Sequence, residues 1–222
     1  MEIIRYAELK AHPWRNGGGV TRELASHPAA ASPKDGPGAL GWDWRVSIAD
    51  VSKAGDFSAF PGMDRVLTVL EGELLLLSVD GAEHPLEKYR PFRFSGEAAA
   101  AGALPTGDIR DLNVITRRGV FKGYTSIIEL SKKRAHPVFE GQFGILLQGQ
   151  AAVTPGTAGA EPDAPSGGEP SGGEPAAGSP GTQAAEPTTL ARYDAVVGSD
   201  TGTPEILGRG FLAVVSIDRV AD

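Results

Sequence analysis

The chain has 222 residues, no cysteine and a formal net charge of −7, and 41% of its residues are hydrophobic. The absence of cysteine excludes a disulfide framework, a thiolate metal site and a cysteine nucleophile. No run approaches the roughly 20 apolar residues of a membrane span, and residues 1–5 contain no signal-peptide core. We therefore expect a cytoplasmic protein without a membrane partner, built as one large β unit or as two fused modules.

Residues 155–189 account for most of the negative charge. This segment contains four Glu, one Asp, seven Pro and eight Gly, and it has no basic, aromatic or large aliphatic residue. The rest of the chain carries 21 basic and 23 acidic residues without a basic stripe, so we expect no nucleic-acid partner. Ordering the segment would cost about 1–2 kcal/mol per residue of backbone entropy with little apolar burial in return, which predicts a disordered loop.

The elements predicted along the chain are nearly all strands. Residues 6–11 favour one or two helical turns, and residues 44–51 alternate apolar and polar side chains as a strand does. Further short β-prone runs are bounded by Gly, Pro or Asp: residues 66–70, 73–79, 90–94, 111–116, 124–130, 143–147, 195–197 and 211–217. The pattern predicts an all-β fold.

Turn residues predict antiparallel pairing between several of these strands. Glu71-Gly72 and Asp80-Gly81 each stand between two aliphatic runs, and Gly supplies the positive φ that a tight hairpin needs. Residues 144–153 repeat the arrangement, with Gln148-Gly149 in place of Glu71-Gly72, which indicates a repeated β module. The segment 155–189 then interrupts the second copy as an extended hairpin tip.

Two of the predicted strands carry polar side chains on one face. Strand alternation places Asp111, Asn113 and Arg117 on one face and apolar residues on the other. In the same way Arg45 and Ser47 lie opposite the apolar residues of their strand. Burying such groups without partners is costly, so these faces either meet water or line a cavity that holds a small polar molecule.

Four segments together resemble the HutD/Ves family: residues 14–23 (WRNGGGVTRE), 44–51 (WRVSIADV), 57–65 (FSAFPGMDR) and 111–119 (DLNVITRRG). The resemblance implies a bicupin, in which two cupin-type β-barrels are fused in one chain. We expect residues 1–119 to form the first module with a ligand pocket. Residues 120–222 would form the second, interrupted by the loop 155–189. The resemblance also implies a small-molecule binder associated with bacterial histidine utilisation, with a sensing or flux-limiting role.

Metal binding is not expected from the histidines. Cupin metal sites place two His one residue apart, followed by a Glu and a later His, which brings the ligands to one point. His12, His27, His84 and His136 are widely separated in the sequence. We therefore predict a metal-free protein without a cofactor.

The candidate ligand-binding residues follow from the polar strand faces and from the resemblance. One or more of Arg45, Arg65 and Arg117 would hold a carboxylate through the guanidinium fork. Asp111, Asn113 and Thr21 would orient the ligand, because they combine donors and acceptors. Glu23 and Ser47 complete the set. The expected partner is a small anionic metabolite of the urocanate or formylglutamate type.

Two other functions remain open at this point. The chain could be a metal-independent enzyme that hydrolyses or isomerises such a metabolite, with Glu23 or Asp111 carrying the proton; no nucleophile with an adjacent base identifies a reaction. It could also be an interaction scaffold tethered by the loop 155–189. Barrel edges commonly pair, so a homodimer is a further alternative.

Overall fold

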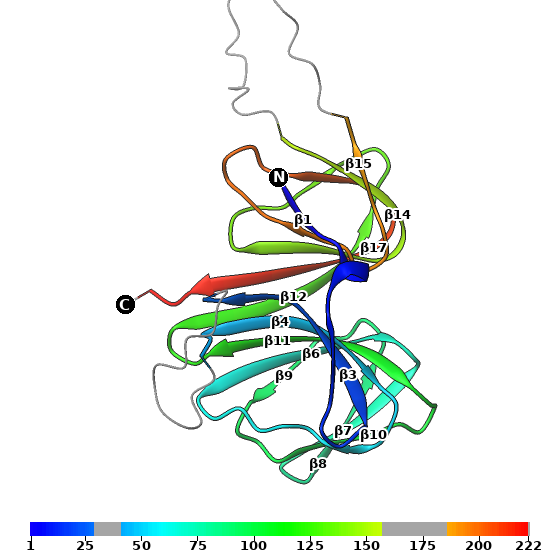
Figure 1. Cartoon of the computed structure of the whole chain (residues 1–222), viewed down its shortest axis with the longest axis vertical. Helices are drawn as coiled ribbons and strands as arrows, with labels where there is room; N and C mark the ends of the chain where they lie inside the picture. Colours follow the sequence, from blue (N-terminus) through cyan, green and yellow to red (C-terminus); the bar gives the residue numbers. More distant parts are fainter. Residues whose placement is uncertain (29–40, 157–185, 222) are drawn as a thin grey trace, which may run out of the picture.

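The computed structural model describes residues 1–28, 41–156 and 186–221, which form three β-sheets and one short 3-10 helix (Figure 1). That helix, η1 (Tyr6–Glu8), is one turn long and lies in the first half of residues 6–11, where one or two helical turns were expected. In the part of the chain that is described, no helix is long and apolar enough to span a membrane. The all-β prediction is confirmed.

Two sheets enclose the first barrel, in the lower half of Figure 1. The six-stranded sheet runs in the order β2 (Ala11–Pro13), β3 (Gly19–His27), β4 (Trp44–Val51), β11 (Ile109–Arg117), β6 (Met63–Glu71) and β9 (Phe92–Ser95). The four-stranded sheet runs in the order β5 (Gly55–Asp56), β10 (Ala100–Ala103), β7 (Leu74–Val79) and β8 (Ala82–Glu87). Their facing side chains form one apolar cluster, in which Val69 of β6 joins Leu75 and Leu77 of β7.

The third sheet has seven strands and occupies the upper half of Figure 1. Its path is β1 (Glu2–Ile4), β16 (Ala195–Val197), β14 (Gln142–Thr154), β17 (Glu205–Arg219) and β12 (Phe121–Leu130), with β13 (His136–Pro137) on β17 and β15 (Thr188–Leu190) on β14. Leu146, Val196 and Leu212 belong to a separate apolar cluster within it. Strand β1 departs from the expected division at residue 119, because it pairs with β16 and not with the first barrel.

The two halves pack against each other through the outer face of the six-stranded sheet. Ile48 of β4, Val66 of β6 and Leu112 of β11 meet Ile145 of β14 and Val215 of β17 in one buried cluster. In Figure 1 β12 runs beside the strands of the first barrel at this junction. One face of β4, β11 and β6 is thereby buried between the modules, and the other face is turned into the first barrel.

One of the two predicted hairpins is confirmed and the other is wrong. Strands β7 and β8 pair across Asp80-Gly81, and both turn residues have positive φ, +50° and +83°, as a two-residue hairpin of this kind requires. At Glu71-Gly72 the chain instead crosses from the six-stranded to the four-stranded sheet, so that β6 pairs with β9 and β11. Positive φ at Gly72 lets the chain turn, but it does not determine which strand β6 pairs with.

The predicted disordered segment 155–189 lies mostly outside the described residues, but its last two positions are structured. Thr188 and Thr189 belong to β15 and pair with Val153 and Ala152 of β14. Threonine is β-branched and favours strands. The composition of the whole segment had placed both threonines in the predicted disordered loop together with their Pro-rich neighbours. Strands β8 and β10 were also absent from the prediction; β8 contains Pro85, and β10 consists of Ala and Gly.

The buried junction between the halves predicts a large stability effect for truncation at Leu112, which is 0% exposed. Leu112→Ala should lower the free energy of unfolding by about 2–5 kcal/mol, because it removes apolar contacts and leaves a cavity. Leu207→Ala, at a side chain that is 42% exposed, is the matched control and should cost less than about 1 kcal/mol. Urea unfolding followed by fluorescence measures both, and equal losses in the two variants would contradict this packing.

Candidate functional site

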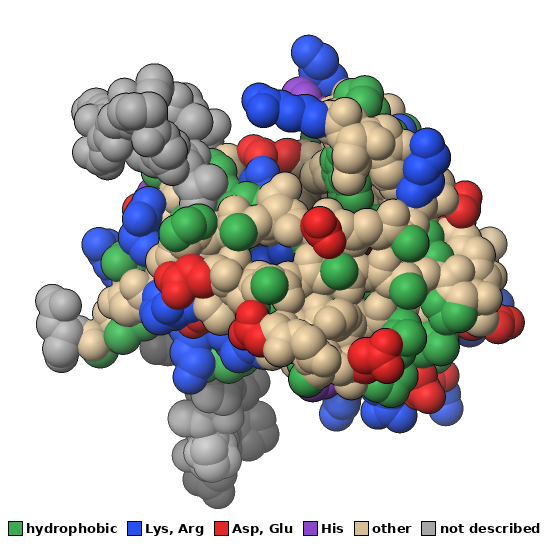
Figure 2. Space-filling model, turned by 90° about the horizontal axis from the view of Figure 1, so that it is seen from below, with side chains coloured by type: hydrophobic (Ala, Val, Ile, Leu, Met, Phe, Trp, Pro, Cys, Tyr) green, Lys and Arg blue, Asp and Glu red, His purple; other side chains and the backbone are tan. Residues whose placement is uncertain are grey.

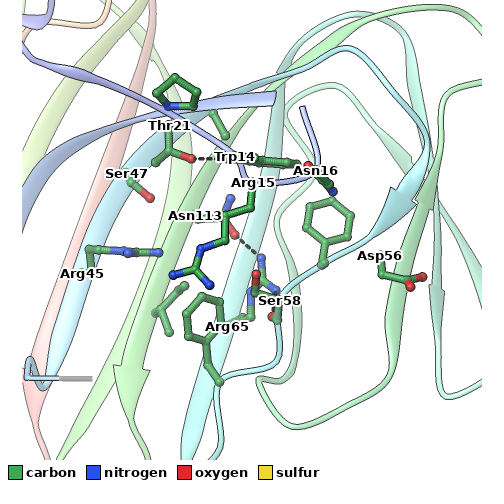
Figure 3. Close-up of a pocket in the computed structure, with 15 residues that line it drawn as sticks. Trp14, Arg15, Asn16, Thr21, Arg45, Ser47, Asp56, Ser58, Arg65 and Asn113 are labelled. Carbon is green, nitrogen blue, oxygen red and sulfur yellow. Dashed lines mark hydrogen bonds between the residues drawn. The ribbon is translucent and has the colours of Figure 1, made fainter. Parts of the chain in front are cut away.

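A pocket of about 530 Å³ opens in the first barrel. On the face of the molecule seen in Figure 2, acidic and basic side chains are interspersed on the surface. The pocket in Figure 3 differs, because arginines dominate its charged lining. Its lining residues are Pro13, Trp14, Arg15, Asn16, Thr21, Arg45, Ser47, Ala49, Asp56, Phe57, Ser58, Phe60, Arg65, Asn113 and Ile115.

The register of three neighbouring strands places the polar residues in rows across the pocket wall. Arg45 of β4 and Arg65 of β6 both pair with Ile115 of β11, the strand between them. Because adjacent strands lie about 4.8 Å apart, the two arginine backbones are separated by about 10 Å. Asn113, two residues before Ile115, occupies the next row beside Ser47.

Arg65 is 3% exposed and is held by polar and aromatic groups. Its Nη2 donates to Oδ1 of Asn113 at 2.7 Å, and its Nη1 donates to the Ser58 carbonyl at 3.4 Å. The guanidinium also lies 5.0–5.4 Å from the ring centroids of Phe57, Phe60 and Phe94, within cation–π range. Its buried Nε has no hydrogen-bond partner among the described residues.

Arg45 has a similar environment at the other end of the row. Its guanidinium lies 4.9 Å from the Trp42 ring centroid and 5.6 Å from that of Phe60. Its Nε is likewise buried without a partner in the described part of the chain. The ring of Phe60 is therefore close to both Arg45 and Arg65.

Burial lowers the pKa of both guanidinium groups. The pKa of Arg65 falls to about 10; Asp111 opposes this shift and the positive charge of Arg45 adds to it. The pKa of Arg45 also falls because of burial, and Glu23 opposes that shift. Both side chains remain cationic at neutral pH, and none of the ion pairs between described residues includes either of them.

Asp111 lies behind Asn113 and is completely buried. Its Oδ1 accepts a hydrogen bond from Asn113 Nδ2 at 2.5 Å, and its Oδ2 has no partner among the described residues. Burial raises its pKa to about 7, although Arg65 and the Asn113 hydrogen bond oppose the shift; Asp50 adds to it. A carboxyl group with this pKa exists in both protonation states near neutral pH.

The turn between β2 and β3 forms one wall of the pocket. Trp14 Nε1 donates to Thr21 Oγ1 at 2.7 Å, and Asn16 Oδ1 accepts from the Gly18 amide at 2.9 Å. The turn is tight at Gly17, where φ is +65°. Figure 3 shows the Arg15 side chain pointing from this turn into the pocket, toward Arg45 and Arg65.

Not all of the residues predicted from sequence line the pocket. The lining includes Arg45, Arg65, Asn113, Thr21 and Ser47. Asp111 lies two residues before Asn113 on β11, outside the lining, and is hydrogen-bonded to it.

Glu23 and Arg117 lie outside the lining. The exposed Glu23 accepts a hydrogen bond from Ser26. Arg117 does share the strand face of Asn113, but it stands at the end of β11, where its Nε donates to Asp43 at 2.6 Å and its side chain is 42% exposed. Alternation predicts a face correctly but does not tell how far along the strand the cavity extends.

Several lining residues were not predicted as ligand contacts. Arg15 and Ser58 lie in connecting segments without strand periodicity, so no alternation pattern marks them. Phe57 and Phe60 also line the pocket, beside Arg65. The three glycines after Arg15, residues 17–19, let the backbone turn tightly and are a sequence feature that could have indicated this wall of the pocket. In the described ranges, no three His, Asp or Glu side chains gather in a way that could hold a metal ion.

The fold and the site define a cupin-type β-barrel protein with an arginine-lined pocket in its first barrel. The family model for HutD matches residues 6–213, and the chain belongs to the HutD family. Protein Ves of Citrobacter koseri is 38% identical over 149 residues, which are 66% of this chain and 72% of that protein. An uncharacterized 21.2 kDa protein in the hutC 3′ region of Pseudomonas putida is 40% identical over 116 residues, 52% of this chain and 57% of its own. These names link the family to the histidine-utilisation locus.

Solved structures agree with this assignment of the fold. A conserved protein of unknown function from Pseudomonas aeruginosa PAO1 matches with a TM-score of 0.71 and 25% identity, over 99% of both chains. HutD from Pseudomonas fluorescens SBW25 matches with a TM-score of 0.68 and 23% identity, over 99% of both chains. Oxalate decarboxylase from Lactobacillus farciminis shares the fold at a TM-score of 0.58 and 7% identity, over 97% of this chain and 85% of that one.

The buried Asp111 predicts a pH-dependent stability. Its pKa rises from 3.8 to about 7 on folding, so its stabilising contribution is complete below pH 3.8 and is lost as the pH rises through 7. Asp111→Asn, which stays neutral, should remove this loss. The difference in unfolding free energy, variant minus wild type, should therefore be about 2–4 kcal/mol larger at pH 8 than at pH 4.

Urea denaturation at pH 4, 6 and 8 measures this difference. Asp56→Asn is the control, because Asp56 is an exposed carboxylate. It should leave the pH profile of the wild-type protein unchanged. A parallel profile for Asp111→Asn and the wild-type protein would contradict the burial of an ionisable carboxyl group here.

Proposed function

We propose that the first-barrel pocket binds a small anionic metabolite of histidine degradation, of the urocanate or formylglutamate type, and that this binding senses or limits flux through the pathway. One observation carries the proposal. Arg45 and Arg65 both have a buried Nε without a partner among the described residues, beside a cavity of about 530 Å³. A carboxylate is the group that such guanidinium forks hold in bidentate geometry.

The energetics of burial support an anionic ligand. Taking a guanidinium out of water without full hydrogen bonding costs several kcal/mol, and aromatic rings offset only part of that cost. Arg15 adds a third positive charge to the lining, whereas Asp56 is its one carboxylate. In Figure 3 Asp56 lies on the opposite side of the pocket from Arg45, at a distance from the paired arginines. The charges therefore favour an anion at the Arg45–Arg65 row.

The neutral polar side chains provide groups that would orient the ligand. Ser47 stands beside Asn113 in the second row of the wall, and Thr21 of β3 pairs with Ala49 of β4 in the row after Ser47. The Thr21 hydroxyl accepts from Trp14, so its own hydrogen is free to donate into the pocket. Phe57 and Phe60 supply apolar surface for the carbon skeleton or a planar ring. A volume of about 530 Å³ is in the usual range for small-metabolite sites.

Binding is favoured over catalysis by the positions of the two carboxylates considered for proton transfer. Glu23 is exposed and outside the lining, and Asp111 is separated from the pocket by Asn113. A general acid or base must be within hydrogen-bond reach of the proton it transfers. Neither residue meets that requirement for a ligand bound at Arg45 and Arg65.

Isothermal titration calorimetry with urocanate, formylglutamate, glutamate and histidine tests the proposal. We expect urocanate or formylglutamate to bind the wild-type protein. Arg45→Ala and Arg65→Met should each weaken that binding by about 10- to 100-fold, since a hydrogen bond to a charged group contributes about 1.5–3 kcal/mol.

Arg209→Ala is the charge-matched control. Arg209 is an exposed residue of β17 in the seven-stranded sheet, remote from the pocket, and its loss should leave the affinity within twofold of wild type. Circular dichroism confirms that each variant is folded. If none of the four compounds binds, or if Arg45→Ala and Arg65→Met bind as tightly as Arg209→Ala, the proposal fails.

A further inference from the structure

A chain of two hydrogen bonds joins the pocket to a carboxyl group in the core of the barrel. Arg65 Nη2 donates to Asn113 Oδ1 at 2.7 Å, and Asn113 Nδ2 donates to Asp111 Oδ1 at 2.5 Å. Arg65 and Asn113 line the pocket, and Asp111 does not. A ligand bound to Arg65 is thus connected through one amide to a group that it does not touch.

The donor and acceptor roles in these two hydrogen bonds fix the orientation of the Asn113 amide. A guanidinium can only donate, so it requires the amide oxygen, and the amide nitrogen is then turned to the carboxyl oxygen of Asp111. Asp111 holds the amide in this orientation whether it is ionised or protonated, because its Oδ1 accepts in both states. Asn113 in turn fixes one nitrogen of Arg65, which leaves Nε for the ligand.

The charges near Asp111 come from a small number of groups. On the neighbouring strands it faces Ala49 of β4 and Val69 of β6, and neither can be charged. The barrel cluster that contains these two residues is apolar across to β7, β8 and β10. Arg65 on β6 and Asp50 on β4 are the charged groups that act on the carboxyl, with opposite effects. Among the described residues, Arg65 is therefore the cation that stabilises the ionised form of Asp111.

An anion bound at Arg65 changes this balance. In the free protein the Arg65 charge favours the ionised form of Asp111, although burial opposes it. A carboxylate at Arg65 cancels that charge and places a second negative charge near Asp111. Like charges in a low-dielectric interior disfavour joint ionisation, so the buried carboxyl becomes easier to protonate.

We propose, on the basis of the function proposed above, that Asp111 is the positioning residue of this site: through Asn113 it orients Arg65, and it takes up one proton from solvent when the ligand carboxylate reaches Arg65. The proton adds to the Asp111 carboxylate to give a neutral carboxylic acid, and no other bond is made or broken. Binding is then tighter at low pH. The pKa of about 7 places the change in affinity between pH 6 and 8.

Calorimetry of the full chain with N-formylglutamate tests this inference, because the ligand itself has no group that titrates between pH 6 and 8. Titrations at pH 7 in Bis-Tris and in Tris, two buffers that bring no anion able to compete for the arginines, give the number of protons taken up from the difference in observed enthalpy. We expect about half a proton per ligand at pH 7, since about half of Asp111 is already protonated there. The dissociation constant should be about tenfold larger at pH 8 than at pH 6.

Two variants separate the proton from the positioning. Asp111→Asn keeps an acceptor for Asn113 but cannot take up a proton, so it should bind without proton uptake, with one affinity from pH 6 to 8. Asn113→Ala breaks the chain and should bind at least tenfold more weakly at both pH values. His12→Gln is the control at an exposed histidine outside the pocket lining, and it should keep the wild-type proton uptake.

The outcomes distinguish this inference from the function on which it rests. If wild-type protein binds N-formylglutamate with the same enthalpy in both buffers and the same affinity at pH 6 and 8, the inference is overturned and the binding function stands. The same holds if Asp111→Asn retains the wild-type pH profile. If the wild-type protein binds neither N-formylglutamate nor any of the other three compounds at pH 6, both are overturned. The two-buffer measurement needs no variant, so it decides the question even if Asp111→Asn does not fold.

Discussion

The structure depends on the alternation of side chains along three adjacent strands, β4, β11 and β6. Each strand buries one face between the modules and turns the other into the first barrel, so Leu112 is core while Asn113 is pocket wall. A shift of register by one residue would exchange the two sets and bury the arginines in the junction. The apolar contacts between the modules therefore hold the polar groups in position.

Desolvation of cations is the second constraint. Arg65 is enclosed by aromatic rings and donates hydrogen bonds to one side-chain amide and one backbone carbonyl. Arg45 lies against the rings of Trp42 and Phe60, and within the described ranges it makes no side-chain hydrogen bond. Neither has an acidic partner within ion-pair distance in the described part of the chain. The protein thus holds positive charge in a confined space with incomplete compensation, a condition that favours an anionic ligand. The buried Asp111 balances this charge only in part, because it is itself costly to ionise.

Sequence alone predicts much of the fold and part of the site, for identifiable reasons. The all-β class follows from short β-prone runs, and the Asp80-Gly81 hairpin from two positions that need positive φ. Glu71-Gly72 looks the same locally, but long-range pairing with β9 and β11 decides its role. Arg117 has the predicted face but lies beyond the cavity, and Arg15 lies in a turn without periodicity. Local sequence patterns predict the strand face on which a side chain lies. Only the folded chain determines which of these side chains meet in the pocket.

The central claim is that the Arg45–Arg65 row is a carboxylate site. A high-resolution crystal structure of the chain co-crystallised with N-formylglutamate tests it most directly. A ligand carboxylate should lie between the two guanidinium groups, within hydrogen-bond distance of both Nε atoms, which have no partner among the described residues. A ligand bound elsewhere, with Arg45 and Arg65 paired to protein side chains in an otherwise empty pocket, would contradict it.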